Sequence, residues 1–391
     1  MSAATDKARF FLEQSVPELR EYERKKIFTK DEITSIIKKR SDFEHKLNAR
    51  GAAPIDFVRY FEYELNLDTL RKKRVKRLGI RAVGHSGQRR IYFILERATR
   101  KFHGDLNLWI QYIEYARKQK ANKKLSIIFT DALRFHPTSA ELWIYAAKYA
   151  LDDHADMSQA RSYMQRGLRF CKNSKKLWIQ YAKLELIYIA KLVARQRILG
   201  LDEERPVPIE AANNDMGDDM VALPAITDED VNPTRNDEEV DQQALSNLNS
   251  TPALTGAIPL AIFDAAMKHF RHDDRFGAEF FDMVLEFNET PCFHKIEEHV
   301  VDTLKTHQPT SPRAQVCYIK LPTAGVDVTS AAFPRAFGTS LARLKETAMT
   351  QDLAREVVAW LQPLLAVDNL DPALKKVFEA TIRSAKRTLA Q

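Results

Sequence analysis

Apolar side chains recur every three or four residues along most of the chain, and the alternating pattern of a β-strand is nearly absent. A first helix is predicted from about residue 6 to residue 25, bent or split at Pro17 because proline disrupts a helix interior. Thr29 and Glu32 have the spacing of a capping box, which starts a second helix. The apolar side of that helix is predicted to consist of Ile33, Ile36, Ile37, Phe43 and Leu47.

Glycine and proline mark the next boundary. Gly51 is expected to end the second helix and Pro54 to begin a third, the usual asymmetry of helix ends. The third helix carries Phe57 and Tyr60 on its apolar side and runs into a basic segment at residues 71–77.

A repeat of 34 to 35 residues follows. Its first mark is a Leu-Trp-Ile segment on one predicted helix, with the tryptophans at Trp109, Trp143 and Trp178. A tyrosine follows the first and third tryptophans after three residues, at Tyr112 and Tyr181, and Phe57 occupies the tryptophan position of an earlier, weaker unit. The second mark is a small residue on the other helix, at Ala98, Ala132 and Gly167. These positions are predicted to form the repeat core.

Two marks that keep one period indicate an array of helix pairs, because each pair has an apolar face that only a neighbouring pair can bury. The tryptophan would fill the space between neighbours, and the small residue would allow close helix approach. The predicted fold is therefore all-α: a TPR-like helical-repeat superhelix (an α-solenoid) with N-terminal helices and a C-terminal helical cap.

Composition interrupts this array once. Fourteen acidic residues and two basic ones lie within residues 202–241, so this stretch has a formal charge of −12. Since the whole chain has a net charge of +7, the remaining residues together carry +19. The surrounding segment has no aromatic residue and five prolines, and it is predicted to be disordered. The predicted organisation is an N-terminal helical region (1–84), repeats (85–201), an acidic loop (202–257), continued repeats (258–310) and a C-terminal helical region (311–391).

The basic segment is the strongest candidate for a binding site. It consists of Arg71, Lys72, Lys73, Arg74, Lys76 and Arg77 around a single valine. One interpretation is contact with RNA phosphates or a nuclear import signal. The other is a solvated helix end, which the helix dipole favours for cations.

A second candidate is the inner face of the array, where the second helices of the repeats would carry exposed arginines. A positive groove for an acidic partner is predicted there, formed by Arg97, Arg100, Arg134, Arg166 and Arg169.

Catalytic and metal-binding patterns are weak. Ser86 lies in a Gly-His-Ser-Gly stretch that lacks the second glycine of a nucleophile elbow. His294 and His299 are five residues apart, which places them on different sides of a helix, and two short acidic–histidine runs, 152–154 and 272–274, fall at predicted turns. The expectation is a chain with no catalytic residue, metal, cofactor or small-molecule substrate. Three scattered cysteines and no long apolar stretch favour a soluble protein of a reducing compartment, with no membrane contact.

The repeat resembles the HAT (half-a-tetratricopeptide) family. The segment 95–98, Leu-Glu-Arg-Ala, matches the second HAT helix, and Pro137 follows Leu133 where the family has a proline. Segments 11–19, 28–33, 40–44 and 57–64 are also similar to the N-terminal region of the HAT-repeat subunits of UTP-B, a subcomplex of the small-subunit processome. This likeness covers roughly residues 8–200.

The resemblance implies a non-enzymatic, nucleolar scaffold in pre-rRNA processing and small ribosomal subunit biogenesis. It implies WD-repeat subunits of UTP-B as partners. It also implies pre-rRNA and the U-three snoRNP, contacted either directly or through other proteins. Two alternatives remain: a HAT scaffold of splicing or mRNA 3′-end processing, and a protein that binds RNA directly through its basic segment.

Overall fold

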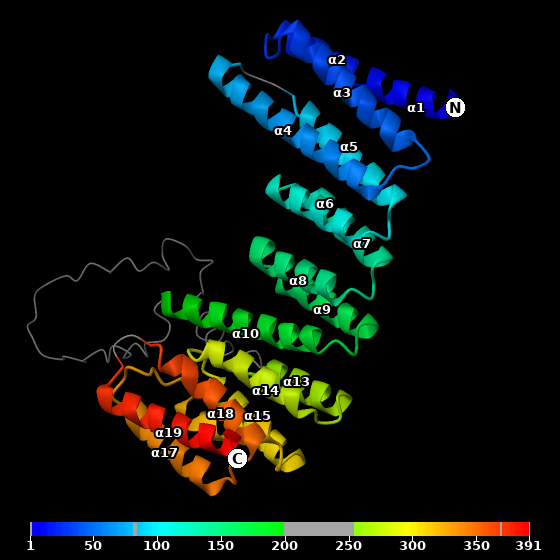
Figure 1. The fold of residues 1–391 in the computed structure, drawn as a ribbon. Helices are drawn as coiled ribbons and strands as arrows, with labels where there is room; N and C mark the ends of the chain where they lie inside the picture. Colours follow the sequence, from blue (N-terminus) through cyan, green and yellow to red (C-terminus); the bar gives the residue numbers. More distant parts are fainter. Residues whose placement is uncertain (1, 81–83, 199–253, 368–369, 391) are drawn as a thin grey trace, which may run out of the picture. The chain divides into compact units, whose positions relative to one another are not determined.

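The computed structural model describes residues 2–80, 84–198, 254–367 and 370–390. Within these ranges all regular structure is helical, as Figure 1 shows, and the predicted all-α helical-repeat class is confirmed. Most of the predicted acidic loop, residues 202–253, lies outside the described residues. The chain divides into two compact units, residues 1–142 and 143–391.

The first unit begins with two short helices and two long ones and continues with the first repeats. Helices α4 and α5 pack side by side, as do α1 with α3 and α6 with α7. The helices are α1 (Ser2–Glu13), α2 (Val16–Arg24), α3 (Lys30–Asn48), α4 (Pro54–Leu78), α5 (Ser86–Lys101), α6 (Leu106–Lys118) and α7 (Asn122–Phe135). Helix α8 (Ala140–His154) contains the division between the units.

In the second unit, α10 packs against α13, although 58 residues lie between the two helices in the chain. The helices are α9 (Met157–Phe170), α10 (Lys175–Ile198), α13 (Ala257–His269), α14 (Asp274–Val284), α15 (Phe293–His307), α16 (Pro312–Lys320), α17 (Phe333–Glu346), α18 (Gln351–Leu364) and α19 (Pro372–Ala390), with short 3-10 turns at Leu285–Phe287 and Leu321–Thr323.

The local start signals act as predicted near the N-terminus, whereas α3 ends at Asn48, before the predicted stop at Gly51. Pro17 is an early residue of α2, which is separate from α1. The Thr29 hydroxyl accepts a hydrogen bond from the Glu32 N–H (3.3 Å), and the Glu32 carboxylate accepts one from the Thr29 N–H (2.9 Å), so the capping box is confirmed. Pro54 begins α4, as expected.

Charged side chains occupy part of the core between these helices. Arg40 on α3 is 1% exposed and donates two hydrogen bonds to the carboxylate of Glu64 on α4, at 2.7 and 2.8 Å. Glu18 on α2 lies 3.7 Å from Arg40 and 3.5 Å from Arg90 on α5. Four helices are therefore joined by one buried cluster of ion pairs. Because a desolvated charge is costly without its partner, this cluster constrains how the helices can pack.

A second buried pair joins α3 to α5. Arg97 donates to both oxygens of the buried Glu44 carboxylate at 3.0 Å. The Arg97 guanidinium also lies over the rings of Phe11 and Phe93, 4.1 and 5.1 Å from their centroids. Helix α1 is thereby held against the same two helices.

The repeat marks meet in the core. The Trp143 ring covers Gly167, and a Cβ at Gly167 would lie 2.9 Å from the ring, closer than side chains pack. The indole rings of Trp109, Trp143 and Trp178 each stack on an aromatic ring at the end of a following helix, Phe135, Phe170 and His269 respectively. Trp178 is partly exposed, whereas the other repeat-core positions are buried: Phe57, Trp109, Tyr112, Trp143, Tyr181, Ala98, Ala132 and Gly167.

A four-residue turn between successive helix pairs repeats as well. In each instance the N–H of the fourth residue bonds to the carbonyl of the first, at 3.1 to 3.2 Å. The turns are Phe102–Asp105, His136–Ser139, Cys171–Ser174 and Gln308–Ser311. The last turn leads into α16, so the predicted boundary at residue 310 falls inside a repeat-type turn.

The last helices form a core of their own. Phe333 and Phe337 of α17 pack with Phe378 of α19 and with buried leucines of α18. The Asp371 carboxylate accepts a hydrogen bond from the Ala373 N–H at 2.9 Å, next to Pro372, the first residue of α19.

We predict that Gly167→Leu destabilises the chain, because the new side chain would overlap the Trp143 ring. The expected cost is about 1–3 kcal/mol, which lowers the Tm by roughly 2–8 °C. Gly338→Leu is the matched control: Gly338 is also a helical glycine of the second unit, but a Cβ added there would have no neighbouring atom within 4 Å. Thermal unfolding followed by circular dichroism measures both, and equal Tm values would contradict the packing argument.

We predict that Arg40→Met costs about 3–5 kcal/mol, because it leaves the Glu64 carboxylate buried and unpaired. The double variant Arg40→Met/Glu64→Leu should recover most of this loss, since both charges are then gone. Arg9→Met, which breaks the exposed Arg9–Glu13 pair on α1, should cost less than about 1 kcal/mol. Urea unfolding of the four chains provides the test; a double variant no more stable than Arg40→Met would refute it.

Candidate functional site

The basic segment forms the last two turns of α4, which ends at Gly79 in the left-handed conformation (φ 61°). Its first residue, Arg71, is only 5% exposed. Arg71 donates hydrogen bonds to the Asp68 carboxylate at 2.7 and 3.0 Å and to the Gly84 carbonyl at 3.2 Å. Arg71 thus fastens the segment before α5 to α4.

Arg74 also has an internal role. Its guanidinium donates to both carboxylate oxygens of Glu32 at 2.7 Å and to the Ile27 carbonyl at 3.1 Å. The Arg74 hydrogen bonds hold the pKa of the Glu32 carboxyl at about 2. The same guanidinium lies 4.8 Å from the centroid of the Phe28 ring. Arg74 therefore joins the turn before α3 to the end of α4.

The other four cations of the segment are exposed. Lys72 pairs with the outer oxygen of Asp68 at 2.9 Å, and its side chain is still 48% exposed. Lys73, Lys76 and Arg77 lie on the exposed side of the same two turns. The structure therefore separates the predicted site into two structural arginines and four accessible cations.

The predicted groove is partly present in the first unit. A cavity of about 470 Å³ lies between α5 and α7 and is lined by Arg100 and Arg134 among others. Trp109 and Tyr112 of α6, both nearly buried, form part of its lining. Glu96, which pairs with Arg100 at 2.5 Å, and Asp131 also line it, so the charge of the groove is mixed.

The groove also has apolar walls that the sequence reasoning missed. Ile127 and Phe135 of α7 line the cavity and are 63% and 49% exposed. The sequence does contain a signal for these walls: Phe135 and Phe170 are 35 residues apart, so an aromatic residue recurs at the end of the second helix with the period of the repeat. An apolar wall beside cations suits a protein segment better than a bare polyanion.

The remaining groove arginines have other surroundings. Arg97 does not line this cavity and points instead to Glu44 and two phenylalanine rings. Arg166 of the second unit lies 5.7 Å from the centroid of the Trp143 ring and is exposed, as is Arg169.

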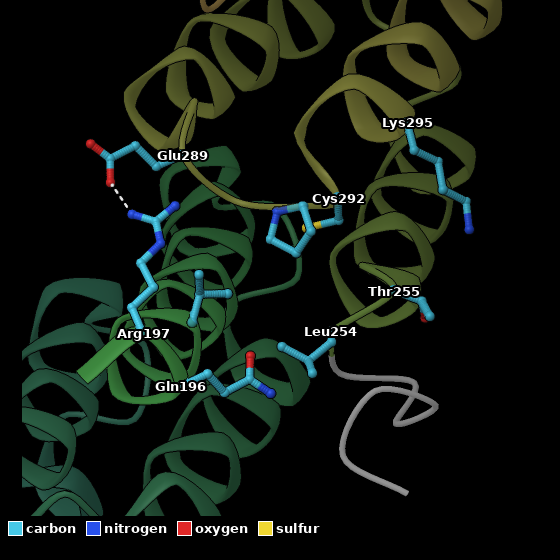
Figure 2. Close-up of a pocket in the computed structure, with 9 residues that line it drawn as sticks. Gln196, Arg197, Leu254, Thr255, Glu289, Cys292 and Lys295 are labelled. Carbon is cyan, nitrogen blue, oxygen red and sulfur yellow. Dashed lines mark hydrogen bonds and ion pairs between the residues drawn. The ribbon is translucent and has the colours of Figure 1, made fainter. Parts of the chain in front are cut away.

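Figure 2 shows a cavity of about 700 Å³ in the second unit, between the end of α10 and the start of α15. Arg197 and Glu289 face each other across one side at 3.3 Å, and Lys295 lies on the other. The only thiol in its lining belongs to Cys292, which is 3% exposed, and burial raises its pKa. A thiol with a raised pKa is a poor nucleophile at neutral pH.

The weak catalytic and metal patterns have local structural partners. The Ser86 hydroxyl lies 3.1 Å from the Tyr22 hydroxyl, and His85, not Ser86, precedes the first turn of α5. His299 contacts Asp264 at 2.7 Å, without His294. Among the described residues, no three His, Cys, Asp or Glu side chains gather in a metal-binding group. None of the helices in this described part of the chain combines the length and the hydrophobicity needed to span a lipid bilayer.

Glu297 of α15 is a buried carboxyl group outside these surfaces. It is 0% exposed, and neither carboxyl oxygen has a hydrogen-bond partner. Burial raises its pKa to about 8, so the group carries its proton at neutral pH in the folded chain. Its lack of solvent contact makes it a feature of the core.

Sequence comparison identifies the relatives of the N-terminal part. A family model described as U3 small nucleolar RNA-associated protein 6 matches residues 12–102, from α1 to the end of α5. The matched region contains the basic segment and the buried Arg40 cluster. Over this N-terminal region, the chain is similar to U3 small nucleolar RNA-associated protein 6. This confirms the resemblance that the sequence segments indicated.

Individual relatives agree. The fission yeast protein (Schizosaccharomyces pombe) of this name is 44% identical over 198 residues, which are 50% of this chain and 41% of the relative. The human homolog is 35% identical over 185 residues, 46% of this chain and 31% of the relative. The Dictyostelium discoideum homolog is 33% identical over 189 residues, 48% of this chain and 31% of the relative. The matched part therefore spans less than half the length of these relatives.

We predict that Glu297 makes the stability of the chain fall as pH rises from about 5 to 8. In this window the unfolded chain releases the proton, whereas the folded chain keeps it up to a pKa of about 8. The free energy of unfolding should therefore fall by up to about 1.4 kcal/mol per pH unit from this group.

Glu297→Gln should remove this part of the pH dependence, because the amide has nearly the same shape and does not titrate. Glu298→Gln changes an exposed neighbour on the same helix and should leave the slope unaltered. Urea unfolding at pH 5, 6, 7 and 8 measures the slopes. Parallel curves for the parent chain and Glu297→Gln would show that the buried carboxyl does not titrate in this window.

Proposed function

We propose that the chain acts as a non-enzymatic scaffold in early assembly of the small ribosomal subunit, within the U3 snoRNP-associated processome that processes pre-rRNA. The observation that carries this proposal is the similarity of residues 12–102 to the family model of U3 small nucleolar RNA-associated protein 6, together with the 44% identity of half of the chain to the fission yeast protein of that name. The expected location is the nucleolus, where that RNA-associated assembly would work.

The finer assignment is to the UTP-B subcomplex, with its WD-repeat subunits as direct partners. The helical repeats support this assignment, because stacked helix pairs present long surfaces that can hold several proteins. The groove between α5 and α7 is a candidate contact: it combines exposed apolar walls at Ile127 and Phe135 with Arg100 and Arg134. A partner segment with an apolar anchor and a neighbouring carboxylate would fit this lining.

The mechanism would be tethering. A scaffold that binds two partners at once turns their encounter into an intramolecular event, which raises their effective concentration without any chemical step. The buried Cys292 and Glu297 support a non-enzymatic role, because neither group has the exposure that a reacting residue needs.

The test is affinity purification of the tagged full chain from nuclear extract, with and without nuclease, followed by mass spectrometry. WD-repeat subunits of UTP-B should be recovered in near-equal amounts and should resist nuclease. Recovery of splicing or polyadenylation factors in their place would overturn the proposal and leave only the repeat fold.

A charge-reversal variant tests the groove in the same experiment. Arg100→Glu/Arg134→Glu should reduce recovery of at least one nuclease-resistant partner several-fold, because the rim of the groove then repels a carboxylate. Lys118→Glu/Lys123→Glu is the control: both lysines are exposed in the same unit and lie outside the groove lining. Equal recovery with both variants would remove the groove from the proposal.

A further inference from the structure

The exposed cations of α4 are joined by cations from another part of the chain. The turn before α3 places Lys26 and Lys30 beside the end of α4, in a cavity of about 600 Å³ that Arg77 also lines. Lys26 has a left-handed backbone (φ 52°), which bends the chain back there. The Arg74 hydrogen bond to the Ile27 carbonyl holds this turn against α4.

A second cavity, of about 480 Å³, lies on the other side of the same helix end. Lys72 and Lys76 line it together with His85 and Gln88. Among the described residues of this lining none is acidic. The first cavity contains one carboxylate, Glu23, which lies 3.8 Å from Lys30. The end of α4 is therefore a ridge of exposed cations between two basic cavities.

The aromatic residue of this region is covered. The Phe28 ring is 4% exposed and has the Arg74 guanidinium over it. No other Phe, Tyr or Trp is among the described residues that line the two cavities. Recognition of RNA bases by single-strand binders uses exposed aromatic rings as stacking platforms. This surface provides charges without such a platform.

We propose that this surface binds the phosphate backbone of RNA directly and without base preference. The phosphate contacts would come from Lys72, Lys73, Lys76 and Arg77, with Lys26 and Lys30 extending the surface. The choice of RNA as the polyanion rests on the proposed function, whereas the contact with phosphates rests on the cations and cavities. Arg71 and Arg74 are positioning residues that fix the helix end and the turn.

An acidic protein segment fits this surface less well than an extended polyanion. A single carboxylate is bound most specifically by the paired N–H groups of an arginine, whereas the exposed cations here are mostly lysines, which act as point charges. A phosphodiester chain carries a charge at every nucleotide and can follow the ridge from one cavity to the other. Its binding would release counterions, which makes the affinity strongly salt-dependent.

The experiment measures binding of the purified full chain to a labelled 20-nucleotide oligouridylate by fluorescence anisotropy, between 50 and 200 mM salt. If four phosphates are contacted, the logarithm of the affinity should fall with the logarithm of salt concentration with a slope of about −3. An oligoadenylate of the same length should bind within a few-fold of the same affinity.

The variant Lys72→Gln/Lys73→Gln/Lys76→Gln/Arg77→Gln should weaken binding about 100-fold near 100 mM salt and remove most of the salt slope. Glutamine keeps a good helix propensity, and circular dichroism verifies the fold. Lys26→Gln/Lys30→Gln should lose less, with a slope smaller by about 1.

Lys375→Gln/Lys376→Gln/Arg383→Gln/Arg387→Gln is the matched control, since it removes four exposed cations from one helix, α19, with the same change in net charge. It should bind almost as the parent chain does. Equal losses in the two four-residue variants would mean that net charge alone attracts RNA, and would overturn the site.

Three other outcomes would also overturn the inference. A large preference for one base would mean that bases are read. Unchanged RNA binding by the α4 variant, with loss of nuclear localisation, would make the segment an import signal. Unchanged RNA binding with loss of a nuclease-resistant partner would make it a protein-docking surface; in that case the proposed scaffold function would survive and the RNA contact would not.

Discussion

The contact between a large ring on one helix and a small residue on the next sets the spacing of the repeats. At Gly167 the Trp143 ring lies so close to the backbone that a Cβ would not fit without movement. In addition, Trp109, Trp143 and Trp178 each stack on an aromatic ring at the end of a following helix. Because each helix pair must present a similar apolar face to its neighbour, these core positions recur with the period of 34 to 35 residues, and the connecting turns recur as well.

The first helices are held together in a different way. They have no tryptophan, and buried ion pairs take its place between α2, α3, α4 and α5. Such pairs contribute little net stability, because desolvation offsets most of the attraction, but they penalise every packing that separates the partners. The Arg40–Glu64 pair therefore acts mainly to select one arrangement of α3 against α4. These helices lie within or at the edge of residues 12–102, the segment that the family model matches.

The end of α4 carries basic residues in two different environments. Its two arginines at positions 71 and 74 face carboxylates of the unit, and the intervening and following cations face solvent. Positions 71 and 74 are three residues apart, a little less than one helix turn, so both lie on the packed side of α4. The other cations of the segment lie on the exposed side. The internal arginines fix the position of the helix end that carries the exposed cations, and the groove between α5 and α7 is a separate, more apolar surface. The two surfaces therefore differ in chemistry, one mainly cationic and the other apolar with mixed charge.

The amino-acid sequence by itself determined the helical class, the capping box at Thr29, the start of α4 at Pro54 and the register of the tryptophans and small residues. These features depend on local geometry or on a period, and both can be read along one chain. The sequence reasoning did not find Arg40, Glu44 and Glu64, although their spacing continues the apolar stripes of α3 and α4. A charge at a core position looks like an exposed one until its partner is known.

The tertiary structure decided which of the basic residues are accessible, that Lys26 and Lys30 join them, and that Arg97 is partly buried against Glu44 and does not line the groove. The physical reason is that burial of a charge depends on an opposite charge brought from another helix. The partners of Arg40, Arg74 and Arg97 lie 24, 42 and 53 residues away in the chain, so only the folded arrangement could identify them.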